Sequence, residues 1–178
     1  MNMTAVTPVL LGMLAMGPRS GYDIKTVVDR STRFFWAASY GQIYPELRRL
    51  EAEGLVEGED RPNGGRSRRV YELTESGRDA LRDWLLSSRF NVELRDESLL
   101  QLFFADSLPR EQALKLLEDR KTAHGQLLEI LHEIENLPGG KDPDFIDLVL
   151  RWGIEFNEWG AEWCERHLKR LRDETKAA

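Results

Sequence analysis

One short segment of the chain combines an apolar helical stripe with side chains able to contact nucleic acid. Residues 39–57 read SYGQIYPELRRLEAEGLVE. Apolar residues recur there at the i, i+3, i+4 and i+7 spacing of a helix with one buried face. They are Tyr40, Ile43, Tyr44, Leu47 and Leu50. Short polar groups occupy the first turn, and Arg48 and Arg49 follow where they would meet phosphate. The pattern is typical of a DNA recognition helix, predicted here over 39–53.

A second cluster of arginines follows this helix. Arg61, Arg66, Arg68 and Arg69 fall within 61–69, without an acidic residue among them. Between them, the sequence PNGG predicts a tight hairpin, because Asn-Gly and Gly-Gly tolerate positive φ. Such a tip suits phosphate contact or insertion into a narrow minor groove. An isolated cluster of this kind is more often a solvated loop, but its place after a recognition-type helix favours DNA binding.

The elements that must position these residues are three helices followed by a hairpin. The first helix covers about Thr4–Met16 and ends at Gly17-Pro18. The second begins at Ser20, with Asp23 in the capping-box position. In the third, Pro45 either delays the regular helix or bends its first turn. Three helices with a two-stranded wing form a winged helix-turn-helix, and we assign it to residues 1–88.

A fourth helix and an acidic, wholly helical region complete the chain. Thr74 caps the fourth helix, which is expected to bury Trp84 and Leu85. Residues 1–90 carry 13 Lys and Arg against 12 Asp and Glu, whereas residues 91–178 carry 12 against 19. The acidity therefore lies away from the arginine clusters. Further helices are predicted over 97–105 and 110–135, and Asp142-Pro143 opens the last one.

The last predicted helix carries a heptad-like apolar seam, with alternating spacings of four and three residues. Its members are Phe145, Val149, Trp152, Phe156, Trp159 and Trp163. An apolar surface of this size usually marks an interface. We expect part of it to pack within the chain and the rest against a second copy. Residues 89–178 are therefore predicted to be an α-helical dimerisation domain.

Several classes of protein are disfavoured. The single cysteine, Cys164, excludes an internal disulfide framework and fits a reducing cytoplasm. No apolar run is long enough to span a membrane. No glycine-rich phosphate loop, nucleophile elbow or paired-cysteine motif points to an enzyme. The evidence for a metal-binding site is weak: it consists of Cys164 and His167 on one predicted helix and His124 and His132 on another. We therefore predict no metal and no cofactor.

Four segments of the first half resemble the PadR family of bacterial transcriptional regulators. They are GPRSGYDI at 17–24, YGQIYPELRRLE at 40–51, EGLV at 53–56 and YELTESG at 71–77. Together they cover most of residues 8–85 in the right order and spacing. Ser20 stands where the family often has histidine, and serine is a competent cap. The resemblance implies a winged helix-turn-helix that binds palindromic promoter DNA as a dimer and usually represses.

The second half is similar, in length and helical pattern, to the longer PadR-like tails related to virulence-activator C-terminal regions. The resemblance suggests that some members hold flat aromatic molecules between tryptophans at the dimer interface. Trp152, Phe156, Trp159 and Trp163 are the corresponding candidates for binding a small aromatic effector. An aromatic stripe at helical spacing is more often core, and that alternative stays open.

The sequence therefore predicts a mainly α protein, with a winged helix-turn-helix and an all-helical dimerisation region. Its expected partners are double-stranded DNA, a second copy and a small aromatic effector, and no membrane. The residues predicted to contact DNA are Ser20, Tyr22, Ser39, Tyr40, Gln42, Tyr44, Arg48, Arg49, Asn63, Arg66, Arg68 and Arg69. The alternative is a winged-helix protein-interaction module, which has no need of phosphate ligands on its wing.

Overall fold

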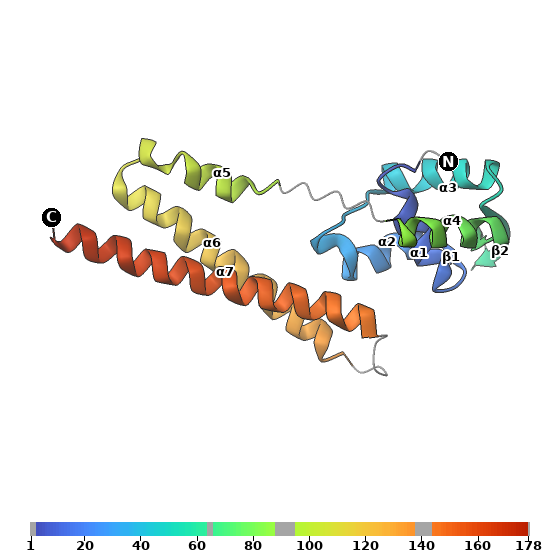
Figure 1. Ribbon diagram of the computed structural model, residues 1–178. Coiled ribbons are helices and arrows are strands. Elements are labelled where there is room, and N and C mark those ends of the chain that lie inside the picture. The colour runs from blue at the N-terminus through green and yellow to red at the C-terminus, as the bar shows by residue number, and fades with distance from the viewer. Residues whose placement is uncertain (1–2, 64–65, 88–94, 138–143, 178) are drawn as a thin grey trace. The chain divides into compact units, whose positions relative to one another are not determined.

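The protein folds into two compact units, Met1–Asn91 and Val92–Ala178. The structure is a computed structural model that describes residues 3–63, 66–87, 95–137 and 144–177. Most described residues are helical, and the first unit also contains a small antiparallel sheet (Figure 1). The predicted fold class is confirmed. The predicted hairpin turn at Gly64-Gly65 and the predicted helix start at Asp142-Pro143 lie outside the described residues.

The first unit is built from helices around one apolar core. They are α1 (Thr7–Ala15), α2 (Gly21–Arg30), the 3-10 turn η1 (Thr32–Phe34), α3 (Tyr40–Ala52) and α4 (Glu75–Leu86). Side chains of α1, α2 and α3 meet in this core, where Leu10, Ile24 and Leu47 are fully buried. The capping box starts α2 as predicted: Ser20 Oγ accepts from the Asp23 N–H at 3.3 Å, and Asp23 Oδ2 accepts from the Ser20 N–H at 3.1 Å.

The sheet has three strands, one more than the sequence predicted. They are β1 (Arg19–Ser20), β2 (Val56–Asn63) and β3 (Arg66–Leu73), in the order β1-β3-β2 with both pairings antiparallel. The wing strands run in register from Val56 opposite Leu73 to Asn63 opposite Arg66. A two-residue strand such as β1 has no periodicity to detect, so only its pairing with β3 reveals it.

The expected burial along α4 is wrong at its C-terminal end. Only Ala80 and Leu81 of this helix pack against the core, whereas Trp84 and Leu85 are exposed. The amphipathic pattern identified an apolar face correctly. The pattern does not specify what covers that face, and no other described part of the first unit covers Trp84 or Leu85.

The second unit is a helical hairpin with a short helix before it. Its elements are α5 (Glu97–Phe103), the 3-10 turn η2 (Ala105–Ser107), α6 (Arg110–Glu135) and α7 (Asp144–Ala177). The helices α6 and α7 lie side by side (Figure 1), and their buried contacts centre on Leu117, Cys164 and Leu168. None of the described helices is long and apolar enough to cross a membrane.

An ion pair fastens α5 to α6. Asp96 caps α5 by accepting from the Leu99 N–H at 3.0 Å, and its carboxylate lies 2.8 Å from the Arg120 guanidinium. The Arg120 hydrogen bond holds the pKa of Asp96 well below its usual range. Because both side chains are largely shielded from solvent, this contact fixes the short helix where its own few apolar contacts would not.

Candidate nucleic-acid interface

The predicted recognition helix is α3, and it begins at Tyr40 despite the proline in its second turn. Gln42 Oε1 accepts from both the N–H and the hydroxyl of Ser39, each at 3.0 Å. These bonds stabilise the first turn, so the helix begins at Tyr40 although Pro45 has no N–H to donate. The first turn of α2 comes close to α3 at Gly21, where an added Cβ would lie 2.7 Å from the Tyr44 ring.

The face of α3 that carries the predicted base-reading residues is open to solvent. Tyr40 and Tyr44 were expected on its buried stripe, but they are 45% and 40% exposed and stack on each other with centroids 6.1 Å apart. Only Ile43, Leu47 and Leu50 face the core, because the buried stripe is narrower than the run of apolar residues suggested. Gln42 and Arg48 are exposed as well, and Tyr22 on α2 is 60% exposed.

Glu46 of α3 is buried, although it is not part of the apolar stripe that the sequence predicts for this helix. It is 7% exposed and accepts hydrogen bonds from Thr4 and Thr7 on the N-terminal segment and from Arg49 on its own helix. These donors, above all the Arg49 guanidinium, lower the pKa of Glu46 to about 2, whereas burial of the carboxylate by itself would raise it. Arg49 also pairs with Glu53. Its guanidinium therefore anchors α3 to α1, whereas Arg48 has no such partner among the described residues.

The wing arginines also differ from one another. Arg68 forms an ion pair with Asp23 at the start of α2. Arg69 forms ion pairs with Glu51 at 2.5 Å and with Asp60 at 3.2 Å, and Arg61 pairs with Glu59 at 2.9 Å. The side chains of two further predicted residues at the tip, Asn63 and Arg66, lie outside the described part of the chain.

A hollow of about 530 Å³ separates the wing from the helix-turn-helix. Its walls combine hydroxyl, aromatic and guanidinium groups from β1, α2, α3 and β3. They are Ser20, Gly21, Tyr22, Tyr44, Ser67, Arg68, Arg69 and Tyr71. The tertiary structure thus gathers predicted residues from four elements around one concave surface. Such a surface can take a polyanionic backbone, which meets hydrogen-bond donors and positive charge on its walls.

The aromatic seam of α7 divides into an open part and a buried part. Trp152 and Phe156 stack with centroids 5.3 Å apart and planes within 7°, and Trp159 follows 6.2 Å from Phe156. These three rings are exposed. Trp163 instead packs against the small core around Leu117. Of the four predicted effector residues, three therefore form one open surface and the fourth belongs to the core.

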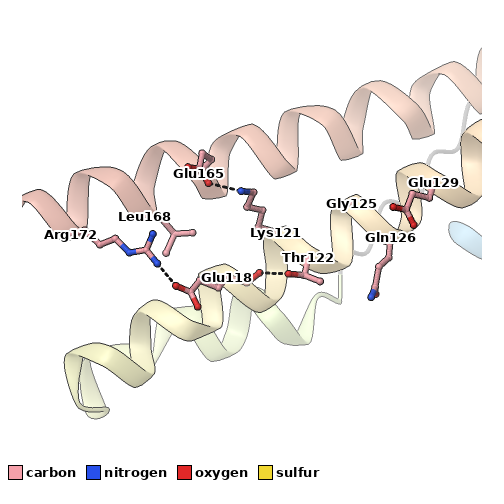
Figure 2. A pocket seen from close by; sticks show the side chains of 9 residues that line it. All are labelled: Glu118, Lys121, Thr122, Gly125, Gln126, Glu129, Glu165, Leu168 and Arg172. Atoms are coloured by element: carbon pink, nitrogen blue, oxygen red, sulfur yellow. Dashed lines mark hydrogen bonds and ion pairs between the residues drawn. The ribbon is translucent and has the colours of Figure 1, made fainter.

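The second unit also has a groove of about 490 Å³ between α6 and α7, and it is polar (Figure 2). Lys121 lies 2.6 Å from Glu165 across it, and Arg172 pairs with Glu118. None of the predicted effector residues lines this groove. Both positively charged side chains in its lining, Lys121 and Arg172, are thus paired with carboxylates.

The described residues contain no cluster of histidine, cysteine and carboxylate side chains placed to hold a metal ion. Cys164 is buried, and burial raises the pKa of its thiol. The His167 ring lies 4.4 Å from that of Trp163, and His124 Nδ1 lies 2.8 Å from the amide oxygen of Asn157. These histidines take part in packing between and along helices.

The two units match two described families. Residues 10–83 match the transcriptional regulator PadR-like family, and residues 94–172 match the virulence activator alpha C-terminal family. The chain is similar to the negative transcriptional regulator PadR of Bacillus subtilis. The two are 32% identical over an alignment of 166 residues, which covers 88% of this chain and 91% of the relative.

Solved structures resemble the chain over nearly its whole length. The crystal structure of Bacillus subtilis PadR in complex with operator DNA has a TM-score of 0.86 and 32% identity, and the match covers 94% of this chain and 99% of that one. The complex of the same protein with p-coumaric acid has a TM-score of 0.77 and 30% identity, covering 95% and 99%. Both units thus have counterparts within a single protein of known structure.

Proposed function

The chain belongs to the PadR-like family and is a DNA-binding transcriptional regulator, and we propose that it acts as a dimeric repressor on a palindromic promoter site. The matched families and proteins are regulators of transcription, not enzymes. One observation carries the proposal. The polar start of α3 is exposed beside an arginine-bearing wing, across a hollow that both elements line.

In this proposal the exposed part of α3 enters the major groove. Tyr40, Gln42 and Tyr44 lie at or near base edges, because they occupy the first turns of the helix. The Gln42 amide group remains a donor while its oxygen accepts from Ser39. Arg48 contacts phosphate further along the helix.

The wing and the start of α2 contact the DNA backbone on either side of α3. Asn63 and Arg66 flank the hairpin turn, where a tip can reach phosphate or the minor groove. Ser20 is buried and caps α2, so its role is to hold Tyr22 at an exposed helix start. Arg49, Arg68 and Arg69 are held by carboxylates, and we assign them a supporting part.

Apolar surface in the second unit supports the dimer. Five side chains along the first turns of α7 are exposed although all are large and apolar: Phe145, Ile146, Leu148, Val149 and Trp152. Leu100 and Phe103 on α5 and Phe104 at its C-cap are also largely exposed. So many exposed apolar side chains are rare on monomers. A second copy would cover them and would supply the two-fold axis that a palindromic site requires.

The DNA-binding proposal can be tested with two variants that should lose DNA affinity in different ways. Arg48→Ala should weaken binding to all duplexes alike and reduce the salt dependence by about one phosphate contact. Gln42→Ala should cost about 1–3 kcal/mol on the preferred site and little on unrelated DNA. Binding is measured by gel shift over several salt concentrations, with a duplex that the wild-type protein selects from a random-sequence pool.

Arg78→Ala provides the control, because it removes one exposed positive charge from α4 in the same unit. It should bind like the wild type. Wild-type protein that binds no DNA at low salt, or binds it independently of salt, would contradict the proposal and favour a protein-interaction module. Equal losses on every duplex for Gln42→Ala would contradict base reading by α3.

We further propose that the open aromatic face takes a small aromatic effector. The flat, exposed stack of Trp152 on Phe156 supports this, as does the p-coumaric acid bound in the similar Bacillus subtilis structure. Titration with p-coumaric acid should give saturable heat and quench tryptophan fluorescence. Trp152→Ala should abolish the heat, whereas Trp36→Phe in the first unit should leave it unchanged. No saturable heat with the wild type would contradict an effector of this chemical class.

A further inference from the structure

Glu51, in the last turn of α3, joins that helix to both wing strands. Its Oε1 accepts a hydrogen bond from the backbone N–H of Gly58 on β2 at 3.1 Å. The same oxygen lies 2.5 Å from Arg69 Nη2 on β3. The Glu51 side chain is largely shielded from solvent. One carboxylate therefore connects the recognition helix to both strands of the wing.

Gly58 provides the space for this connection. A Cβ at that position would lie 2.6 Å from Arg69 Nε and 2.7 Å from Glu51 Oε1. Its backbone has no positive φ, so the strand conformation does not require glycine there. A glycine inside a strand often marks a close approach by another group. Here the group is the Glu51–Arg69 ion pair, which crosses the wing directly over Gly58.

Arg69 is held from its other side as well. Its guanidinium lies 3.2 Å from Asp60, the residue opposite it in the β2–β3 register. It also lies over the Tyr71 ring, with 5.9 Å from Cζ to the centroid. Any phosphate contact by this arginine must therefore compete with two carboxylates. Its position points to a structural link between α3 and the wing.

We propose that Glu51 is a positioning residue for DNA binding, which sets the orientation of the wing relative to α3 through Arg69 and the gap at Gly58. The inference rests on the proposed binding of DNA by α3 and the wing together. A helix in the major groove and a hairpin on the backbone must engage at the same time. A wing already held in place loses less conformational freedom on binding, and that raises affinity for the correctly spaced contacts.

This proposal predicts a change in DNA affinity opposite to the one that electrostatics alone predicts. Glu51 is a negative charge in the DNA-binding unit, so its removal should strengthen attraction to DNA if charge alone matters. If Glu51 orients the wing, its removal should weaken binding to the preferred site. Non-specific binding needs no fixed wing orientation, and it should stay equal or become slightly tighter.

The test compares Glu51→Gln with Glu57→Gln in the full chain. Glu57 is exposed on β2 and has no ion-pair partner among the described residues, so its variant makes the same charge change without breaking the link. Affinity is measured for the selected duplex and for an unrelated duplex, together with the melting temperature. We expect Glu51→Gln to lose about tenfold on the selected duplex only. Glu57→Gln should bind both duplexes as tightly as the wild type or more so.

Gly58→Ala tests the same link without any change in charge. The added methyl group should push Glu51 and Arg69 apart and reproduce the selective loss, and Glu51→Asp should recover part of it. Gly58→Ala also tests the proposal if Glu51→Gln does not fold. Wild-type-like binding of Gly58→Ala, or tighter binding of Glu51→Gln to both duplexes, would overturn the inference. If the wild-type protein binds neither duplex, the result would instead contradict the proposed function itself.

Discussion

Replacing Gly77 with alanine is expected to lower the melting temperature of the first unit by about 10 °C. Gly77 lies in the first turn of α4, and a Cβ there would overlap the backbone carbonyl oxygen of Leu55. That oxygen accepts from the Thr74 N–H at 3.2 Å, while Thr74 Oγ1 donates to the Gly54 carbonyl and accepts from the Gly77 N–H. The carbonyl cannot withdraw without breaking the junction between α3, β2 and α4.

The magnitude follows from two opposed effects. Alanine in place of glycine favours a helix by about 1 kcal/mol. Forcing a methyl group into a packed backbone contact costs about 3 kcal/mol. The net loss of about 2 kcal/mol corresponds to a shift of roughly 10 °C in a unit of this size. Thermal unfolding followed by circular dichroism measures it.

Gly12→Ala in α1 is the matched control. An added Cβ there meets nothing within 4 Å, so only the helix propensity changes. We expect its melting temperature to equal or exceed that of the wild type. Equal melting temperatures for the Gly77 and Gly12 variants would contradict the close approach of α4 to Leu55.

Introducing two charges on the apolar face of α7 is expected to convert the protein to a monomer. Leu148 and Trp152 lie one turn apart and are both more than half exposed, so glutamates at these positions leave the α6–α7 packing intact. In a dimer the same positions would bury unpaired charges. Sedimentation at micromolar concentration should show a dimer for the wild type and a monomer for Leu148→Glu/Trp152→Glu.

Loss of the dimer should also reduce affinity for the palindromic site by at least about 100-fold, because the second half-site no longer adds to the first. Lys169→Glu makes the same change in net charge at an exposed position further along α7. It should remain dimeric and bind DNA as the wild type does. A wild-type monomer at micromolar concentration, or a dimeric double variant, would contradict the interface.

Much of the local structure was predictable because its causes lie close together in the chain. The Ser20–Asp23 capping box spans three residues and starts α2. Gly54 comes directly after the recognition helix predicted over 39–53, and it has the positive φ of 72° that favours glycine there. The helix predicted over 110–135 has those bounds in the structure. Periodicity, caps and turn residues act over a few positions, so they can be recognised without a fold.

The state of each polar side chain was not predictable in this way. Glu46 accepts from Thr7, which is 39 positions away, and Arg69 pairs with Glu51, 18 positions away. No pattern within α3 indicates that Glu46 is buried, or that Arg49 anchors the helix while its neighbour Arg48 is open. Likewise the spacing of Tyr44 predicts a buried side chain, but Tyr44 is 40% exposed.

Patterns among near neighbours therefore specify the main helices, the arginine-bearing hairpin and their order, but not the short strand β1. Which arginines are exposed and which are held by carboxylates depends on the packed chain. The reason is physical: backbone conformation depends on near neighbours, whereas an ion pair needs two side chains within a few ångströms, which only the packed chain brings together. Arg69, Gly58 and Glu51 meet only because the wing folds back onto the end of α3.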